Sequence, residues 1–167
     1  AKSSLKVWWK CRKGHEWKAN ISNRSDKGNG CPYCANQWVT PETSLATLRP
    51  DVAAEWNNSK NESLLPSQVL SQSMKRVWWI CSKGHEWEAI ISNRTGIGKG
   101  KNTKCPYCAN KKVSEHNNLA VTHPELAKEW DFQNNGDLTP DKIISGSSKK
   151  VWWVCELGHS FQATVLH

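Results

Sequence analysis

The sequence predicts a series of small α+β repeats, in which β-hairpins with cysteine-containing turns are joined by short helical linkers. Three observations lead to this class. The phrase VWWKCRKGHEW at 7–17 returns as VWWICSKGHEW at 77–87 and as VWWVCELGHSF at 151–161. The seven cysteines of the 167-residue chain recur with these phrases, and the segments between them share a second pattern of Pro, Ala and Trp. Repetition at a regular spacing indicates repeated structural units rather than one large domain.

Each repeat opens with a predicted β-hairpin. The stretch VWWKC is rich in β-branched and aromatic residues, and Lys-Gly marks a turn after it. In the strand that follows, Trp17, Ala19 and Ile21 alternate with polar residues, and the alternation returns at 87–91 and 161–165. We therefore expect one buried face per hairpin. The tryptophans of this pattern are expected mainly in the core, with base stacking as the alternative.

The segments between the hairpins predict short helices. In RPDVAAEW and HPELAKEW, a proline suits the first helical turn, and the Val or Leu, Ala and Trp fall on one helical face. The predicted divisions of the chain are a first zinc module at 1–38, a helical linker at 39–74, a second zinc module at 75–112, a second helical linker at 113–148, and a partial third zinc module at 149–167.

The spacing of cysteine and histidine is the basis for predicting zinc. The two complete modules read C-x3-H-x15-C-x2-C and C-x3-H-x19-C-x2-C. Three thiolates and one imidazole form a closed tetrahedral set for structural Zn²⁺, and a closed set leaves no position for water or substrate. Iron, redox-active thiols and unligated cysteines are the alternatives. The predicted ligands are Cys11, His15, Cys31 and Cys34 in the first module, and Cys81, His85, Cys105 and Cys108 in the second.

The third copy holds only half of a ligand set. Cys155 and His159 are its predicted zinc ligands, and no Cys-Pro-Tyr-Cys follows them. Either the other ligands lie beyond residue 167, or they are borrowed, or the ion is absent. The first of these is the simplest expectation.

Four motifs together carry a resemblance to a known family. They are VWW-x-C-x-x-GH-x-W, the Ser-Asn-Arg triplet, GCPYCAN and the linker pattern SLA-x-x-x-P-x-x-A-x-EW. Over nearly its whole length the chain resembles the tandem probable zinc-ribbon, or treble-clef, domain family. The resemblance implies zinc-bound repeats, often attached to nuclease-like or other nucleic-acid-associated domains, and no enzymatic activity of the repeat itself. Two departures are Lys104, which replaces the glycine before the second Cys-Pro-Tyr-Cys, and the incomplete third copy.

The net charge of +8 is divided unevenly along the chain. Residues 6–38 carry seven Lys/Arg and two acidic residues, and residues 75–112 carry nine and two, whereas both linkers are net acidic. A basic charge confined to the cysteine-containing modules favours a polyanionic partner. We therefore expect nucleic acid, either DNA or RNA, bound mainly through its phosphates.

The repeated Ser-Asn-Arg triplet supplies the candidate contacts to that partner. Arg24 and Arg94 are predicted to contact phosphate or base, assisted by Asn23 and Asn93. The alternative is that they hydrogen-bond locally and hold the loop or the cysteines. The lysines predicted to neutralise phosphates are Lys13, Lys27, Lys83, Lys99, Lys101 and Lys104.

These observations favour a non-enzymatic function. We expect nucleic-acid binding, alone or within a larger nucleic-acid-processing complex, and no small-molecule substrate. A structural zinc scaffold for protein–protein contacts is the alternative, and an accessory domain of a nuclease is the third. An odd number of cysteines beside histidines indicates a reducing, intracellular compartment, and the chain shows no signal-peptide pattern and no apolar run of about 18 residues.

Overall fold

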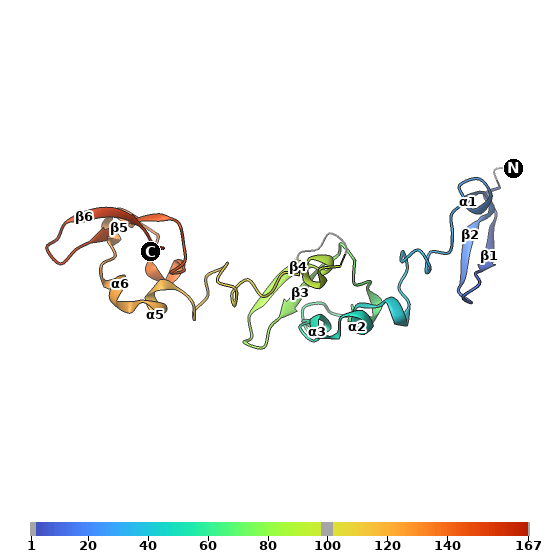
Figure 1. Ribbon diagram of the computed structural model, residues 1–167, viewed down its shortest axis with the longest axis horizontal. Coiled ribbons are helices and arrows are strands. Elements are labelled where there is room, and N and C mark those ends of the chain that lie inside the picture. The colour runs from blue at the N-terminus through green and yellow to red at the C-terminus, as the bar shows by residue number, and fades with distance from the viewer. Residues whose placement is uncertain (1–2, 98–101, 167) are drawn as a thin grey trace. The chain divides into compact units, whose positions relative to one another are not determined.

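Each repeated phrase forms a two-stranded antiparallel hairpin in the computed structural model, which describes residues 3–97 and 102–166 (Figure 1). The three hairpins share one register, in which the second tryptophan of VWW lies opposite Trp17, Trp87 or Phe161. The predicted hairpins are therefore confirmed. The strands are β1 (Lys6–Lys10) with β2 (Glu16–Asn20), β3 (Arg76–Ile80) with β4 (Glu86–Ile90), and β5 (Lys150–Val154) with β6 (Ser160–Thr164).

A short helix follows each of the first two hairpins. The alternating pattern predicted a strand as far as Ile21, but the strand ends one residue earlier, and α1 (Ile21–Ser25) begins there. The reason is tertiary: the first helical N–H groups, at Ile21 and Ser22, donate to the carbonyls of Leu5 and Ser3, before the hairpin. The helix α4 (Ile91–Thr95) begins in the same way, with N–H groups that donate to carbonyls at 75 and 73. The Ser-Asn-Arg triplet is therefore helical.

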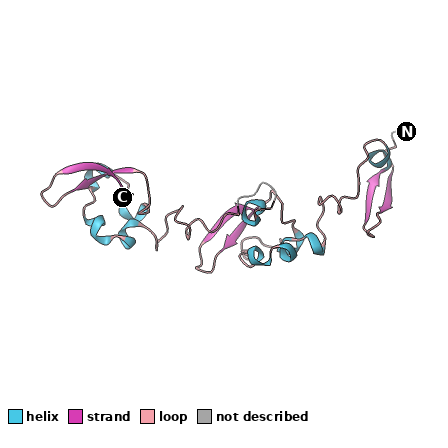
Figure 2. Cartoon of the chain, viewed as in Figure 1, coloured by secondary structure: helices cyan, strands magenta, loops and turns pink. Residues whose placement is uncertain are grey.

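The linkers contain several short helices, as Figure 2 shows. Ser44 and Asn118 cap the first α-helix of each linker, since their side chains accept from the N–H groups of Thr47 and Val121. A proline opens the next helix in both linkers. The first linker holds η1 (Pro41–Thr43), α2 (Leu45–Leu48), α3 (Pro50–Ala53) and η2 (Pro66–Gln68), and the second holds α5 (Leu119–Thr122), α6 (Pro124–Lys128), α7 (Phe132–Asn135) and η3 (Pro140–Lys142).

The chain divides into two units, Ala1–Thr103 and Lys104–His167. In the first unit, the linker packs on the hairpin that follows it, where Trp56 forms a bridge with Trp79 and the two rings meet edge to face at 5.4 Å. Linker and hairpin thus share one core.

The second unit repeats this arrangement. Its linker tryptophan, Trp130, bridges to Trp153, again with an edge-to-face ring contact at 5.4 Å. The core of this unit consists of Leu119, Trp130, Ile143, Val151, Trp153 and Val165. The prediction that Trp17, Trp56, Trp87 and Trp130 are core residues is confirmed, since all four are buried.

Among the described residues, no helix combines the length and the apolar character that a membrane span requires.

Candidate metal centre

The hairpin turn positions the first two ligands of the first module. Cys11 follows β1 and His15 precedes β2, and the Cys11 N–H donates to the His15 carbonyl at 3.0 Å. The Gly14 N–H donates to the Cys11 carbonyl at 3.0 Å. Gly14 has a φ of 85°, which favours glycine. A tight turn therefore places a thiol and an imidazole on the same side of the hairpin end.

The Cys-Pro-Tyr-Cys turn supplies the other two ligands. The Ala35 N–H donates to the Cys31 carbonyl at 3.0 Å, which closes one turn of chain around the two cysteines. Cys31 is buried, and the Tyr33 ring lies 5.1 Å from the His15 ring. The turn is thus packed against the hairpin end, and its two thiols face the first pair of ligands.

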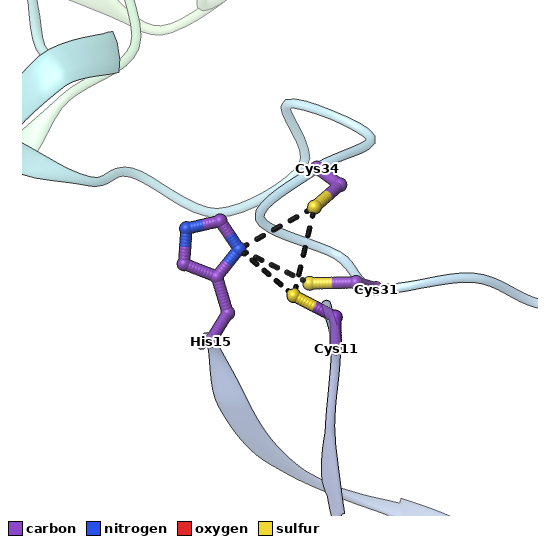
Figure 3. Close-up of side chains that lie close together, drawn as sticks. All are labelled: Cys11, His15, Cys31 and Cys34. Atoms are coloured by element: carbon purple, nitrogen blue, oxygen red, sulfur yellow. Dashed lines mark hydrogen bonds between the residues drawn. The ribbon is translucent and has the colours of Figure 1, made fainter. Parts of the chain in front are cut away.

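The four ligand atoms converge on one point, as Figure 3 shows. The His15 Nδ1 atom lies 3.4 Å from the Sγ atoms of Cys11 and Cys34 and 3.5 Å from that of Cys31. The Sγ atoms of Cys11 and Cys34 are 3.8 Å apart.

These separations fit a tetrahedral zinc site. One ring nitrogen carries either one proton or one lone pair, so it cannot hydrogen-bond three sulfurs at once. A tetrahedral ion with Zn–S distances of about 2.3 Å places its sulfur ligands about 3.8 Å apart, and this is the observed distance between Cys11 and Cys34. The donor set is closed by four protein ligands, so the ion stabilises the fold.

The pKa values of two thiols at this site are shifted in opposite directions. Partial burial raises the pKa of Cys11, but hydrogen bonds from the backbone at Lys13 and His15 and from the other thiols lower it to about 7. Desolvation, hydrogen bonds with Cys11 and Cys31 and the charge of these two groups raise the pKa of Cys34 to about 11. One thiolate thus opposes the ionisation of its neighbour, and a bound divalent cation removes that opposition.

The second predicted ligand set also comes together. The ligand atoms of Cys81, His85, Cys105 and Cys108 all lie within 4.8 Å of one another. The hairpin turn repeats as well, since the Cys81 N–H donates to the His85 carbonyl at 3.1 Å. The prediction of two Cys3His zinc-binding sites is therefore confirmed.

The third copy has the hairpin turn without a complete ligand set. The Cys155 N–H donates to the His159 carbonyl at 3.1 Å, and the Gly158 N–H to the Cys155 carbonyl at 2.8 Å, as in the complete modules. Within residues 3–97 and 102–166, groups of three or more metal-ligating side chains occur only at the two sites above. Metal binding by Cys155 and His159 stays a prediction.

Arg94 is placed in the core rather than on the surface. Its side chain is buried, and its guanidinium donates to the Thr103 carbonyl and pairs with the Glu55 carboxylate. It also lies over the rings of Trp79 and Trp87. Because its side chain is buried, Arg94 cannot contact a nucleic acid in this structure. It has instead the alternative role considered above, in which it hydrogen-bonds locally and holds the loop.

Arg24 makes a similar but less complete set of contacts. Its Nη1 atom donates to the Asn29 carbonyl at 2.8 Å, and its guanidinium lies 5.0 Å from the centre of the Trp9 ring. Asn23 and Asn93 are half-buried, and their carbonyls accept the N–H groups of residues 29 and 103. The triplet therefore closes the loop that leads to the Cys-Pro-Tyr-Cys turn.

The predicted lysine contacts remain on the surface. Lys13, Lys27, Lys83 and Lys104 are exposed, and none of them forms a salt bridge within the described part of the chain. Lys99 and Lys101 lie outside the described residues.

Sequence reasoning missed Glu55 as a partner of Arg94. The available signal was the Glu-Trp pair that occurs in both linkers, at 55–56 and 129–130. The pattern was interpreted only through its tryptophan.

A model of a known domain family matches the chain in three segments. The family is described as a probable treble clef zinc finger domain, and the matches cover residues 1–37, 52–111 and 126–167, which together are well over half of the chain. A comparison with curated proteins finds no match.

Proposed function

The chain belongs to the probable treble clef zinc finger domain family, and we propose that its zinc-bound modules bind DNA or RNA, mainly through phosphates. The modules act without catalysis, because both zinc sites use four protein ligands and offer no position for a substrate. In this proposal the zinc holds the hairpin and the cysteine turn rigidly, and basic side chains around them make the contacts.

The exposed lysines carry the proposal. Lys13 and Lys83 lie at the hairpin turns, and Lys27 and Lys104 lie in the loops before the Cys-Pro-Tyr-Cys turns. All four are exposed without a carboxylate partner among the described residues. By contrast, the ammonium groups of Lys10, Lys60 and Lys128 pair with glutamates. Unpaired ammonium groups are the type that neutralises phosphates and releases counterions.

A titration of labelled nucleic acid against the zinc-loaded chain tests the proposal. Duplex DNA, duplex RNA and single strands are compared by fluorescence anisotropy at about 50 and about 200 mM salt. We expect binding that weakens steeply with salt. The absence of binding at the lower salt concentration would overturn the proposal.

A pair of matched variants assigns the contacts. Lys13→Gln with Lys27→Gln removes two charges from the first module, and Lys128→Gln with Lys142→Gln removes two charges from a linker. Each lost phosphate contact lowers the slope of log K against log salt by about 0.9 for duplex DNA. We expect that loss only for the module variant, and equal losses in both variants would show that the site is elsewhere.

A scaffold for protein–protein contacts is the second candidate. One observation favours it: the side chain of Trp8 is 71% exposed on the first hairpin, whereas its counterparts in the other hairpins are half-buried.

A further inference from the structure

A broad groove lies between the first Cys-Pro-Tyr-Cys turn and the linker that follows it. Its volume is about 1050 Å³, and small-molecule sites typically have about 300–1,000 Å³. Tyr33 and residues 36–39 form one wall, and most of residues 68–75 form the other. A hydrogen bond joins the walls, since the Gln72 side chain donates to the Asn36 carbonyl at 3.2 Å. The groove therefore has room for a ligand much larger than one amino-acid side chain.

The zinc turn holds Trp38 in the wall of this groove. The Trp38 N–H donates to the Pro32 carbonyl at 3.2 Å, and its ring meets the Tyr33 ring edge to face at 5.2 Å. The Trp38 side chain is still 46% exposed. Its counterpart in the second module, Lys112, is exposed as well, so this position lies at the surface in both complete modules. An exposed aromatic ring on a fixed turn is a surface on which a nucleobase can stack.

Side-chain amides line the groove together with this ring. Those of Asn36, Gln37 and Asn93 make no hydrogen bond to another residue in the part of the chain that the structure describes. Each amide offers two N–H donors and one carbonyl acceptor. The edge of a nucleobase carries donors and acceptors side by side, and a primary amide can meet two of them at once. The polar groups of the groove therefore suit the edge of a base.

The charge of the groove favours an anionic ligand. Among the described residues that line it, Lys75 is the one charged side chain. Lys75 is exposed and forms no salt bridge within the described ranges. A base that enters this groove would therefore bring its phosphate close to a free ammonium group.

A counterpart groove in the second unit has a more basic lining. Each residue that lines it stands 74 positions after a residue that lines the first groove. Lys111 and Lys142 take the places of Gln37 and Gln68, and the charged residues of its described lining are all lysines. Both grooves thus complement a phosphate backbone, and the aromatic ring and the free amides distinguish the first.

We propose that the groove beside Trp38 binds an unpaired base of a single-stranded nucleic acid. The inference rests on the proposed function above and adds the form of the nucleic acid. The base stacks on Trp38, its edge meets the amides, and Lys75 contacts an adjoining phosphate. A single strand is required, because the bases of a duplex are stacked on one another and their faces are covered. An apolar protein segment is the poorer fit, because it would leave the amides without partners.

Two labelled single strands are the probes, each of about eight nucleotides. One carries thymine bases, and the other has the same phosphates and sugars but no bases. Both are titrated into the full zinc-loaded chain and followed by fluorescence anisotropy. We expect the strand with bases to bind at least about fivefold more tightly, because only that strand can stack on Trp38.

Two variants borrow residues from the second module, so they should leave the fold intact. Trp38→Lys and Gln37→Lys introduce the lysines that stand at 112 and 111, and zinc content checks their folding. Each adds a positive charge, so binding of the base-free strand should be equal or tighter. Binding of the strand with bases should weaken relative to it, until the two affinities are nearly equal in Trp38→Lys. Trp8→Ala removes an exposed tryptophan outside the groove and should leave the ratio unchanged.

The outcomes separate this inference from the proposed function. Equal affinities of the native chain for the two strands, or binding of duplex DNA alone, would overturn the inference and leave the proposed function in place. A ratio that Trp38→Lys leaves unchanged would also overturn it and would leave the groove to a protein segment. The absence of binding by every nucleic acid at about 50 mM salt would overturn both.

Discussion

The arginine of the Ser-Asn-Arg triplet joins the hairpin to the loop before the cysteine turn. In both complete modules its guanidinium lies over two tryptophan rings and donates to a loop carbonyl, at Asn29 or at Thr103. In the second module it also pairs with Glu55 of the linker. A cation over aromatic rings combines packing with charge-assisted hydrogen bonds. This arginine therefore holds the loop that leads to the Cys-Pro-Tyr-Cys turn of the zinc site.

Replacement of Arg94 should destabilise the second module. We expect Arg94→Gln to lower the free energy of unfolding by about 2 kcal/mol or more, because the change leaves the Thr103 carbonyl and the Glu55 carboxylate without their partner. Arg24→Gln is the matched control, and its loss should be smaller because Arg24 is less buried. Urea unfolding of the zinc-loaded chain measures both, and equal losses would contradict this account.

Replacement of one thiol should remove one ion. Cys34→Ala leaves three ligands at the first site and all four at the second, so zinc content should fall from two ions per chain to one. Cys155→Ala is the control, because Cys155 is in neither complete set. Elemental analysis after dialysis measures the change. An unchanged zinc content in Cys34→Ala would contradict the assignment of this ligand.

The carboxylate of Asp131 should make the second unit sensitive to acid. A hydrogen bond from Ser160, then bonds from the main chain and side chain of Asn134, lower the pKa of Asp131 below its usual value. A lowered pKa in the folded state stabilises that state above pH about 4, and the contribution is lost as pH falls through the folded pKa. Ser160→Ala should therefore raise the pKa of Asp131, measured by NMR of its carboxyl carbon. An unchanged midpoint would show that Ser160 is not the cause.

At the scale of elements, the hairpin and the linker before it depend on each other. A two-stranded hairpin is at best marginally stable alone in water. The linker supplies the missing partners. Trp56 or Trp130 packs against the second tryptophan of VWW, and the main chain of residues 55–57 or 129–131 hydrogen-bonds along the edge of the following strand. The linkers are therefore parts of the folded units rather than spacers.

Removal of a linker tryptophan should be costly. Trp130→Ala is expected to lower the free energy of unfolding of the second unit by about 3–5 kcal/mol, because it leaves a cavity against Trp153 and removes the indole bond to the Leu138 carbonyl. Trp8→Ala should change stability by less than about 0.5 kcal/mol, because Trp8 is exposed. Denaturant unfolding compares the two, and similar costs would contradict the packing described here.

At the scale of the whole molecule, zinc and apolar packing support different parts of the chain. The first hairpin has a zinc site but no covering linker among the described residues. The third hairpin shares an apolar core with its linker, and residues 149–166 include two of the four ligands of a complete set, Cys155 and His159. Within residues 3–97 and 102–166, a zinc site therefore supports the first hairpin and an apolar core supports the third.

Removal of zinc by a chelator should therefore act unevenly. We expect the amides of β1 and β2 to lose their protection from hydrogen exchange, because this hairpin depends on its ion. The amides of β5 and β6 should retain more of their protection, since the core around Trp130 and Trp153 contains no cysteine. Hydrogen exchange with and without chelator measures this difference. Equal loss of protection in both hairpins would show that metal supports them equally.

The sequence by itself determined the hairpins, the short linker helices and the two zinc ligand sets. These features depend on local patterns: a period of two in the strands, Pro and capping residues at the helices, and fixed spacing within Cys-x3-His and Cys-Pro-Tyr-Cys. Zinc chemistry then joins the two halves of each set, because four soft donors suit one tetrahedral ion. Because the whole four-residue pattern occurs twice, it could be distinguished from a chance group of cysteines.

Only the tertiary structure decided which repeated residues are surface and which are core. Arg94 looked like Arg24 in sequence, yet it is buried because Glu55 is brought to it by a linker that begins far earlier in the chain. Trp8 and Trp78 occupy the same place in the phrase, yet one is exposed and the other is covered by a linker segment. Burial depends on what packs against a residue across the chain, and local periodicity carries no record of that partner.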